Sequence, residues 1–263
     1  MQYDETRLRE VIDRVVRSDP DAEPVFYGVS GSHLYGFPSP DGDVDVRGFH
    51  VVDAERYAML DRPDEQLVVN QDGLTEGFEA YEEIDLVSYE LRKSGMLLYQ
   101  ANFNVLELVF ETDRVMNGVP LEIEALQALV ESHLPMDVPR SYFGMARNNY
   151  RKYLNPDRDS YSPTAKKYLY VLRGLLGAQH VLDEETIRAD VFELAKHGLG
   201  STELIEDLVA VKLEGETATV DPELAERAEA TIVDLFTELD PPETVEKTEY
   251  RDDLDDWMRK VRA

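Results

Sequence analysis

The sequence contains no cysteine, a single tryptophan and few lysines. Without cysteine there are no disulfides or thiolate metal sites, and the five histidines do not stand at metal-ligand spacings. We therefore expect any bound metal to be a hard cation held by oxygen atoms, such as Mg²⁺ or Mn²⁺. Apolar runs approaching the roughly 18 residues of a membrane span are absent, and the first residues lack a signal-peptide pattern. We expect a cytoplasmic protein that does not bind membranes.

Basic residues are also scarce, with 27 Lys and Arg against 55 Asp and Glu, which gives a formal net charge of −28. Such a surface repels itself strongly unless salt screens it, and molar salt shortens the Debye length to about 3 Å. The charge therefore predicts a very salty cytoplasm, as in a halophilic archaeon. We expect the melting temperature to rise between low and molar KCl in a thermal unfolding series. A melting temperature that stayed constant or fell would contradict this interpretation.

One stretch carries most of the chemical information. Residues 25–29 predict a buried strand, Gly31-Ser32 a turn into a short helical segment, and residues 43–48 a second strand. Gly31 allows close approach of the backbone to an anion, and the Ser32 hydroxyl lies beside backbone NH groups that favour phosphate. Asp43 and Asp45 are two apart on a strand, so both carboxylates leave one face and can hold a divalent cation. Acids are so frequent here that the Asp-x-Asp pair alone is equally typical of a solvated acidic face.

A third carboxylate stands out further along the chain. Residues 81–89 predict a strand that turns into a helix through about residue 101, and Asp85 lies within its apolar part. A carboxylate among apolar residues is costly unless it is paired or bound to a cation, so Asp85 is a candidate site residue. Glu82 and Glu83 are alternatives for the same role, and a surface acid without a role is another.

The motif resembles that of nucleotidyltransferases of the DNA polymerase β superfamily. The resemblance extends to their stand-alone members, which include a branch associated with RNA repair. The family pattern is Gly-Ser, a Gly a few residues on, and Asp-x-Asp at the start of the next strand. In this sequence the pattern corresponds to Gly31-Ser32, Gly36, Asp43 and Asp45. One departure is Gly42, where the family usually has Ser directly before the first Asp.

The resemblance implies an α+β fold, with a small mixed sheet flanked by helices and followed by an all-α domain. It implies transfer of a nucleoside monophosphate from a nucleoside triphosphate, with ATP favoured, to a hydroxyl acceptor, with release of pyrophosphate. Asp43, Asp45 and Asp85 would bind two Mg²⁺ or Mn²⁺ ions, and Gly31 and Ser32 would grip the triphosphate. The acceptor stays open among an RNA end, a protein hydroxyl and a small molecule. A catalytically silent nucleotide-binding or regulatory module is the alternative function, which Gly42 keeps open.

The remaining pattern predicts one more strand and then helices. Residues 102–111 are apolar and rich in β-forming residues, which predicts a core strand closing the sheet. Residues 61–80 predict a hairpin or a loop around residues 66–70. Helices are expected at residues 2–18, 121–130, 139–154, 164–182, 185–196, 201–212 and 221–239, and at the C-terminal end. We therefore expect a catalytic domain at residues 1–115, a helical domain at 116–212 and an acidic C-terminal helix and tail at 213–263.

The helical region carries a local excess of positive charge. Between residues 140 and 173 there are eight basic residues and two acids, which is a local excess of six positive charges. Tyrosines are interleaved with these basic residues. Such a surface suits a triphosphate or a nucleic-acid backbone, with tyrosines able to stack on bases. The alternative is internal pairing with acids around a tyrosine-lined helix core. By resemblance to basic residues on an equivalent family helix, the phosphate-binding candidates are Lys166, Lys167 and Arg173.

Overall fold

The computed structural model describes residues 3–40, 42–69, 83–112, 114–117, 123–134, 137–198, 201–215, 217–241 and 248–262. The chain divides into two compact units. The first comprises residues 1–33, 43–133 and 246–263, and the second comprises residues 34–42 and 134–245. Residues 70–80 of the expected hairpin or loop, and the alternative candidate Glu82, lie outside the described residues.

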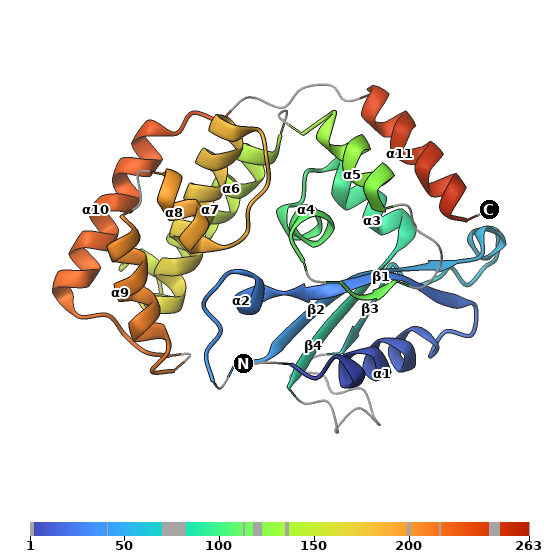
Figure 1. The fold of residues 1–263 in the computed structure, drawn as a ribbon, viewed down its shortest axis with the longest axis horizontal. Helices are drawn as coiled ribbons and strands as arrows, with labels where there is room; N and C mark the ends of the chain where they lie inside the picture. Colours follow the sequence, from blue (N-terminus) through green and yellow to red (C-terminus); the bar gives the residue numbers. More distant parts are fainter. Residues whose placement is uncertain are drawn as a thin grey trace. The chain divides into compact units, whose positions relative to one another are not determined.

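The first unit is built on a mixed five-stranded sheet with the strand order β3-β4-β2-β1-β5 (Figure 1). Its strands are β1 (Ala22–Ser30), β2 (Val44–Val52), β3 (Gln66–Val69), β4 (Ile84–Glu90) and β5 (Arg114–Asn117). Strands β2 and β4 run parallel, and the other neighbouring pairs are antiparallel. The C-terminal end of β1 and the N-terminal ends of β2 and β4 therefore meet at one edge of the sheet.

Helices cover both faces of this sheet. Helix α1 (Glu5–Val16) turns an apolar stripe that includes Val11 and Ile12 toward Val46 and Leu86 of the sheet. On the opposite face lie α3 (Leu91–Tyr99) and α4 (Phe103–Phe110) (Figure 1). The unit also contains α2 (Gly31–Leu34), the 3-10 helix η1 (Ala54–Ala58), α5 (Ile123–Glu131) and α11 (Thr248–Val261), and α11 packs on α3. This arrangement is the expected α+β class.

The expected strand at residues 102–111 is wrong, because this segment forms α4. The Asn102 side chain caps the helix by accepting a hydrogen bond from Val105 N at 3.3 Å, and the apolar side chains bury one face. A short apolar run of this kind is compatible with either a buried strand or a buried helix, so periodicity alone did not decide. The outermost strand next to β1 is instead β5, which pairs with β1.

The second unit is helical, as expected. It contains α6 (Val138–Asn149), the π-helical turn η4 (Tyr150–Leu154), α7 (Ala165–Glu184), α8 (Val191–His197), α9 (Thr202–Lys212) and α10 (Pro222–Glu238). Twelve of the twenty residues of α7 are buried, so this helix forms the centre of the core. None of the helices in the described part of the chain is both long and apolar enough to cross a lipid bilayer.

The helix expected at residues 185–196 is wrong at its start. Helix α7 continues to Glu184, and Glu185 then adopts a left-handed conformation with φ of 54° that ends it. Helix α8 begins only after Asp190, whose side chain accepts hydrogen bonds from Phe192 N and Glu193 N. An N-cap of this kind determines where a helix begins, and the apolar pattern separated the two helices without showing where the second one starts.

The two compact units differ from the three expected segments. Helix α5 packs with α4 and α11 in the first unit, so the first unit extends beyond residue 115. The expected C-terminal segment at residues 213–263 is divided between the two units, because α10 belongs to the second unit and α11 to the first. Residues 34–42 belong to the second unit although both flanking segments belong to the first. Long-range packing of this kind leaves no mark in local composition.

We expect a buried histidine in the sheet to give the stability of the fold a pH dependence. His50 Nδ1 lies 2.7 Å from Ser88 Oγ, which also contacts the Tyr27 hydroxyl. Burial lowers the pKa of His50, and the carboxylates of Glu90, Asp19 and Asp64 oppose this only in part. The folded-state pKa therefore lies below the unfolded value of about 6.5. The unfolded state binds the proton first, so protonation favours unfolding as the pH falls below that value.

We expect the free energy of unfolding to decrease as the pH falls from about 7 to about 5.5, and His50→Gln to weaken this decrease. Denaturant unfolding at several pH values measures both. Surface carboxylates are common to the two proteins over this interval, so the difference between their slopes reports on His50. Equal slopes for the two proteins would contradict the assignment.

Candidate functional site

The glycine-serine corner lies at the end of β1. Gly31 has a φ of +62°, a backbone conformation that residues with a Cβ rarely adopt. A Cβ added at Gly31 would lie 1.8 Å from Oδ2 of Asp45, so the glycine backbone packs directly against this carboxylate. Ser32 follows in the first turn of α2 and is buried. The corner predicted from the sequence therefore adjoins one of the predicted aspartates.

Asp45 and Asp85 lie side by side on neighbouring strands. They are register partners in the parallel pairing of β2 with β4, and Ser30 of β1 is the partner of Asp45 on its other side. Both side chains remain partly accessible, with 25% of Asp45 and 32% of Asp85 exposed. Two carboxylates from segments 40 positions apart in the chain are thus brought to the same edge of the sheet. Ser30 was not singled out from the sequence, since only the strand register places it there.

Arg47 links the two carboxylates. Its Nη2 atom lies 2.8 Å from Asp45 Oδ1 and 3.4 Å from Asp85 Oδ2, and its Nη1 atom donates to the Asp85 carbonyl oxygen at 2.7 Å. Burial alone would lower the pKa of Arg47, but the negative charges of Asp45 and Asp85 outweigh burial and raise it. Arg47 therefore pairs with the two nearby carboxylates.

The donor set suits a hard cation only in part. Carboxylate oxygens are preferred ligands of Mg²⁺ and Mn²⁺, and the Arg47 guanidinium shows that a positive group is accommodated between Asp45 and Asp85. Asp43 precedes β2 and is partly exposed. Within the described ranges, no three His, Asp or Glu side chains are arranged to hold a metal ion. The geometry therefore brings together Asp45, Asp85 and Gly31, and the metal-binding roles of Asp43, Asp45 and Asp85 stay predictions.

Two of the predicted phosphate-binding residues lie at the start of α7. Lys166 and Lys167 are both partly exposed in its first turn. The Lys167 ammonium lies 3.9 Å from the centre of the Tyr153 ring, and that of Lys152 lies 4.7 Å from it. A hydrogen bond with Lys152 lowers the pKa of Tyr153, burial opposes this, and the charge of Lys167 lowers it further. Two ammonium groups around one tyrosine form a local positive site on the helical unit.

Arg173 is placed differently from these lysines. Its side chain is fully buried in α7, and its guanidinium carbon lies 3.6 Å from the centre of the Tyr35 ring. In this arrangement a phosphate could reach Arg173 only if the helical core opened. The pattern of charges along the chain does not indicate that this basic residue faces inward while Lys166 and Lys167 reach solvent.

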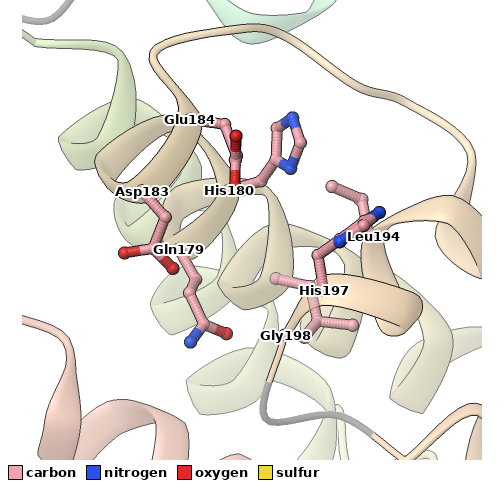
Figure 2. Close-up of a pocket in the computed structure, with 8 residues that line it drawn as sticks. Gln179, His180, Asp183, Glu184, Leu194, His197 and Gly198 are labelled. Atoms are coloured by element: carbon pink, nitrogen blue, oxygen red, sulfur yellow. The ribbon is translucent and has the colours of Figure 1, made fainter.

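A small pocket lies elsewhere in the helical unit, between α7 and α8 (Figure 2). His180, Asp183 and Glu184 of α7 and His197 of α8 are among its lining residues. His180 Nε2 lies 3.0 Å from the Thr186 hydroxyl. None of the site residues predicted from the sequence lines this pocket.

A mixed sheet flanked by helices, with paired aspartates at one edge beside a tight glycine corner, agrees with the DNA polymerase β class of nucleotidyltransferases that the motif indicated. A model described as "RNA repair pathway DNA polymerase beta family" (RlaP) matches residues 5–260. The chain belongs to this family.

Two curated relatives are similar to this chain. The uncharacterized protein YcgL of Bacillus subtilis is 31% identical over 182 residues, which cover 68% of this chain and 65% of YcgL. The uncharacterized protein MJ0002 of Methanocaldococcus jannaschii is 36% identical over 95 residues, or 35% of each chain. The matches thus span less than two thirds of either relative.

A solved structure of a nucleotidyltransferase-like protein from Exiguobacterium sibiricum is also similar to the chain. It is 13% identical, with a TM-score of 0.34, and the match covers 89% of this chain and 73% of that one. A likeness this distant does not by itself establish a shared fold.

Proposed function

We propose that the protein transfers a nucleoside monophosphate, with AMP favoured, from a nucleoside triphosphate to a hydroxyl group, and that the acceptor is an RNA end. The observation that carries the proposal is the pairing of Asp45 with Asp85 on neighbouring strands, directly against the Gly31 backbone. The family description, which names an RNA repair pathway, supports the choice of acceptor. So does the positive site formed by Lys152, Lys167 and Tyr153 in a strongly acidic chain.

In this proposal the sheet edge binds the reacting groups. The backbone at Gly31 and the Ser32 hydroxyl would bind the triphosphate, and Asp43, Asp45 and Asp85 would be the ligands for two Mg²⁺ or Mn²⁺ ions. When bound, these ions would neutralise charge on the phosphates and make the acceptor hydroxyl more acidic. Arg47 would release the two aspartates and become available to a phosphate oxygen.

The acceptor oxygen forms a new bond to the α-phosphorus, and the bond from that phosphorus to the bridging oxygen of the β-phosphate breaks. The hydroxyl proton passes to Asp85, which later releases it to solvent, and the leaving group is pyrophosphate. Lys166 and Lys167 of the helical unit would bind phosphate groups. Arg173 is not part of this step, because it is enclosed in the helical core.

A transfer assay tests the proposal. The purified protein is incubated in molar KCl with Mg²⁺, α-labelled ATP and an oligoribonucleotide, and both labelled RNA and released pyrophosphate are measured. We expect label on the RNA, lost when EDTA is added or when the product is digested with ribonuclease. Label on the protein, or on an added aminoglycoside instead of RNA, would identify another acceptor, and the absence of pyrophosphate release would contradict transfer.

One observation favours a second function. Arg47 already neutralises the negative charges of both aspartates, as it would in a module that binds nucleotides without catalysing their reaction. In addition, Gly42 replaces the usual Ser. Calorimetry separates the two possibilities. Nucleotide binding that is tightened by Mg²⁺ supports the enzyme, whereas binding that is indifferent to Mg²⁺ supports the silent module.

A further inference from the structure

The segment that joins the two halves of the proposed site is held in the core of the helical unit. Residues 34–42 connect the Gly31 corner to the start of β2, yet they pack with the second unit. Tyr35 and Phe37 are 3% and 0% exposed and belong to the same apolar cluster as Leu172 and Leu176 of α7. A loop between catalytic elements usually lies at the surface, so this anchoring needs an explanation.

Arg173 fixes the first part of the segment. Its guanidinium lies against the face of the Tyr35 ring, and the Tyr170 ring meets Tyr35 and Phe37 nearly edge-on, at centre distances of 5.9 and 5.8 Å. Burying a charge in a helical core is costly, and an apolar residue of similar volume would fill the space at lower cost. The aromatic face offsets part of this cost and fixes the position of Tyr35 relative to α7.

The backbone of the segment is fixed as well. Val191 N donates a hydrogen bond to the Tyr35 carbonyl oxygen at 3.1 Å. Gly36 has a φ of +87°, and a Cβ added there would lie 2.6 Å from Oδ2 of Asp190, the N-cap of α8. The turn at Gly36 therefore fits against the start of α8 only without a side chain, which gives a structural reason for this motif glycine.

Lys212 fixes the last part of the segment. Its fully buried ammonium donates a hydrogen bond to Ser39 Oγ at 2.7 Å, and Ser39 is itself buried. The Ser39 carbonyl oxygen accepts a hydrogen bond from Gly42 N at 3.1 Å. Since Gly42 directly precedes Asp43, this chain of bonds reaches the residue before the first motif aspartate.

We propose that Arg173 and Lys212 are positioning residues for Asp43 and Asp45. They hold residues 34–40 in one conformation and thereby set where β2 begins and how its first carboxylates are presented. The inference rests on the proposed function of those aspartates. In this inference Arg173 acts through its contact with Tyr35 and does not bind phosphate directly. The helical unit then contributes to the chemistry of the sheet unit through the segment that it holds.

The test compares Arg173→Met and Lys212→Met with Ile232→Ala, which removes buried volume from α10 in the same helical core. Hydrogen exchange is followed in the peptide that covers residues 43–49, where Val44 N is bonded to Glu83 O. We expect both Met variants to exchange there at least about fivefold faster than wild type, and Ile232→Ala to exchange at the wild-type rate. We also expect kcat for transfer to fall about 10- to 100-fold in the Met variants only.

Conservative variants keep the test decisive if a Met variant does not fold. Tyr35→Phe retains the ring under Arg173 and should behave as wild type, whereas Tyr35→Leu should behave as Arg173→Met. Ser39→Ala removes the acceptor of Lys212 and should accelerate exchange in the same peptide. Wild-type exchange in this peptide for Tyr35→Leu and Ser39→Ala would overturn the inference. A wild-type protein without transfer activity, whose variants still show faster exchange, would refute the proposed function and leave the positioning role standing.

Discussion

Replacing Asp45 or Asp85 with asparagine is expected to lower the rate of nucleotidyl transfer by about a thousandfold or more. Asparagine keeps the size of the side chain and one oxygen toward Arg47, but it removes the negative charge that a divalent cation requires. Since both residues stand on the same sheet edge, the two variants should lose comparable activity, and the double variant should lose little more than either alone. Single-turnover transfer of label from ATP measures the three rates.

The matched control is Glu23→Gln, which also removes a carboxylate charge from the sheet but lies exposed on β1. It should transfer at the wild-type rate. Binding of Mn²⁺, followed by its electron paramagnetic resonance signal, should be lost in the Asp45 and Asp85 variants and retained in the control. Wild-type transfer by Asp45→Asn would remove this carboxylate from the mechanism, and equal Mn²⁺ binding by all the variants would place the metal elsewhere.

The sequence predicted the sheet edge well because its information is local. The alternation of apolar and polar residues at the start of β2 and the apolar residues around Asp85 put both aspartates on strands, and the glycine-serine turn marked the end of β1. What it could not provide is the register that makes Asp45 and Asp85 partners, because strand pairing depends on contacts distant in sequence. The same limit explains the error at residues 102–111, where a short apolar run suits a helix as well as a strand.

The helical unit shows a different limit. Charge counting grouped Arg173 with Lys166 and Lys167, although Arg173 is fully buried and the lysines are partly exposed. The direction of a basic side chain depends on what the helix packs against, here the ring of Tyr35, which is more than a hundred residues away in the chain. The pairing of Arg47 was within reach of sequence reasoning, because its carboxylate partner Asp45 stands two residues away on the same strand.

Gly31→Ala is expected to reduce transfer at least about a hundredfold and to lower the free energy of unfolding by about 2 to 4 kcal/mol. Two effects add in the same direction. The residue has a φ of +62°, which costs energy for any side chain with a Cβ, and the new methyl group would overlap Asp45 Oδ2. The carboxylate must move, and its bond to Arg47 and its position beside Asp85 change with it. Denaturant unfolding and the transfer assay measure the two losses separately.

Gly144→Ala provides the matched control. A Cβ at Gly144, within α6, meets nothing within 4 Å, so alanine should stabilise the helix by about 0.5 to 1 kcal/mol and leave transfer unchanged. A second variant separates the collision from backbone strain: in Asp45→Ala the obstructing carboxylate is gone, so adding Gly31→Ala should cost clearly less stability than it does in wild type. An equal cost in both backgrounds would mean that the glycine corner does not pack against Asp45, and the carboxylate arrangement on which the proposed chemistry depends would then be incorrect.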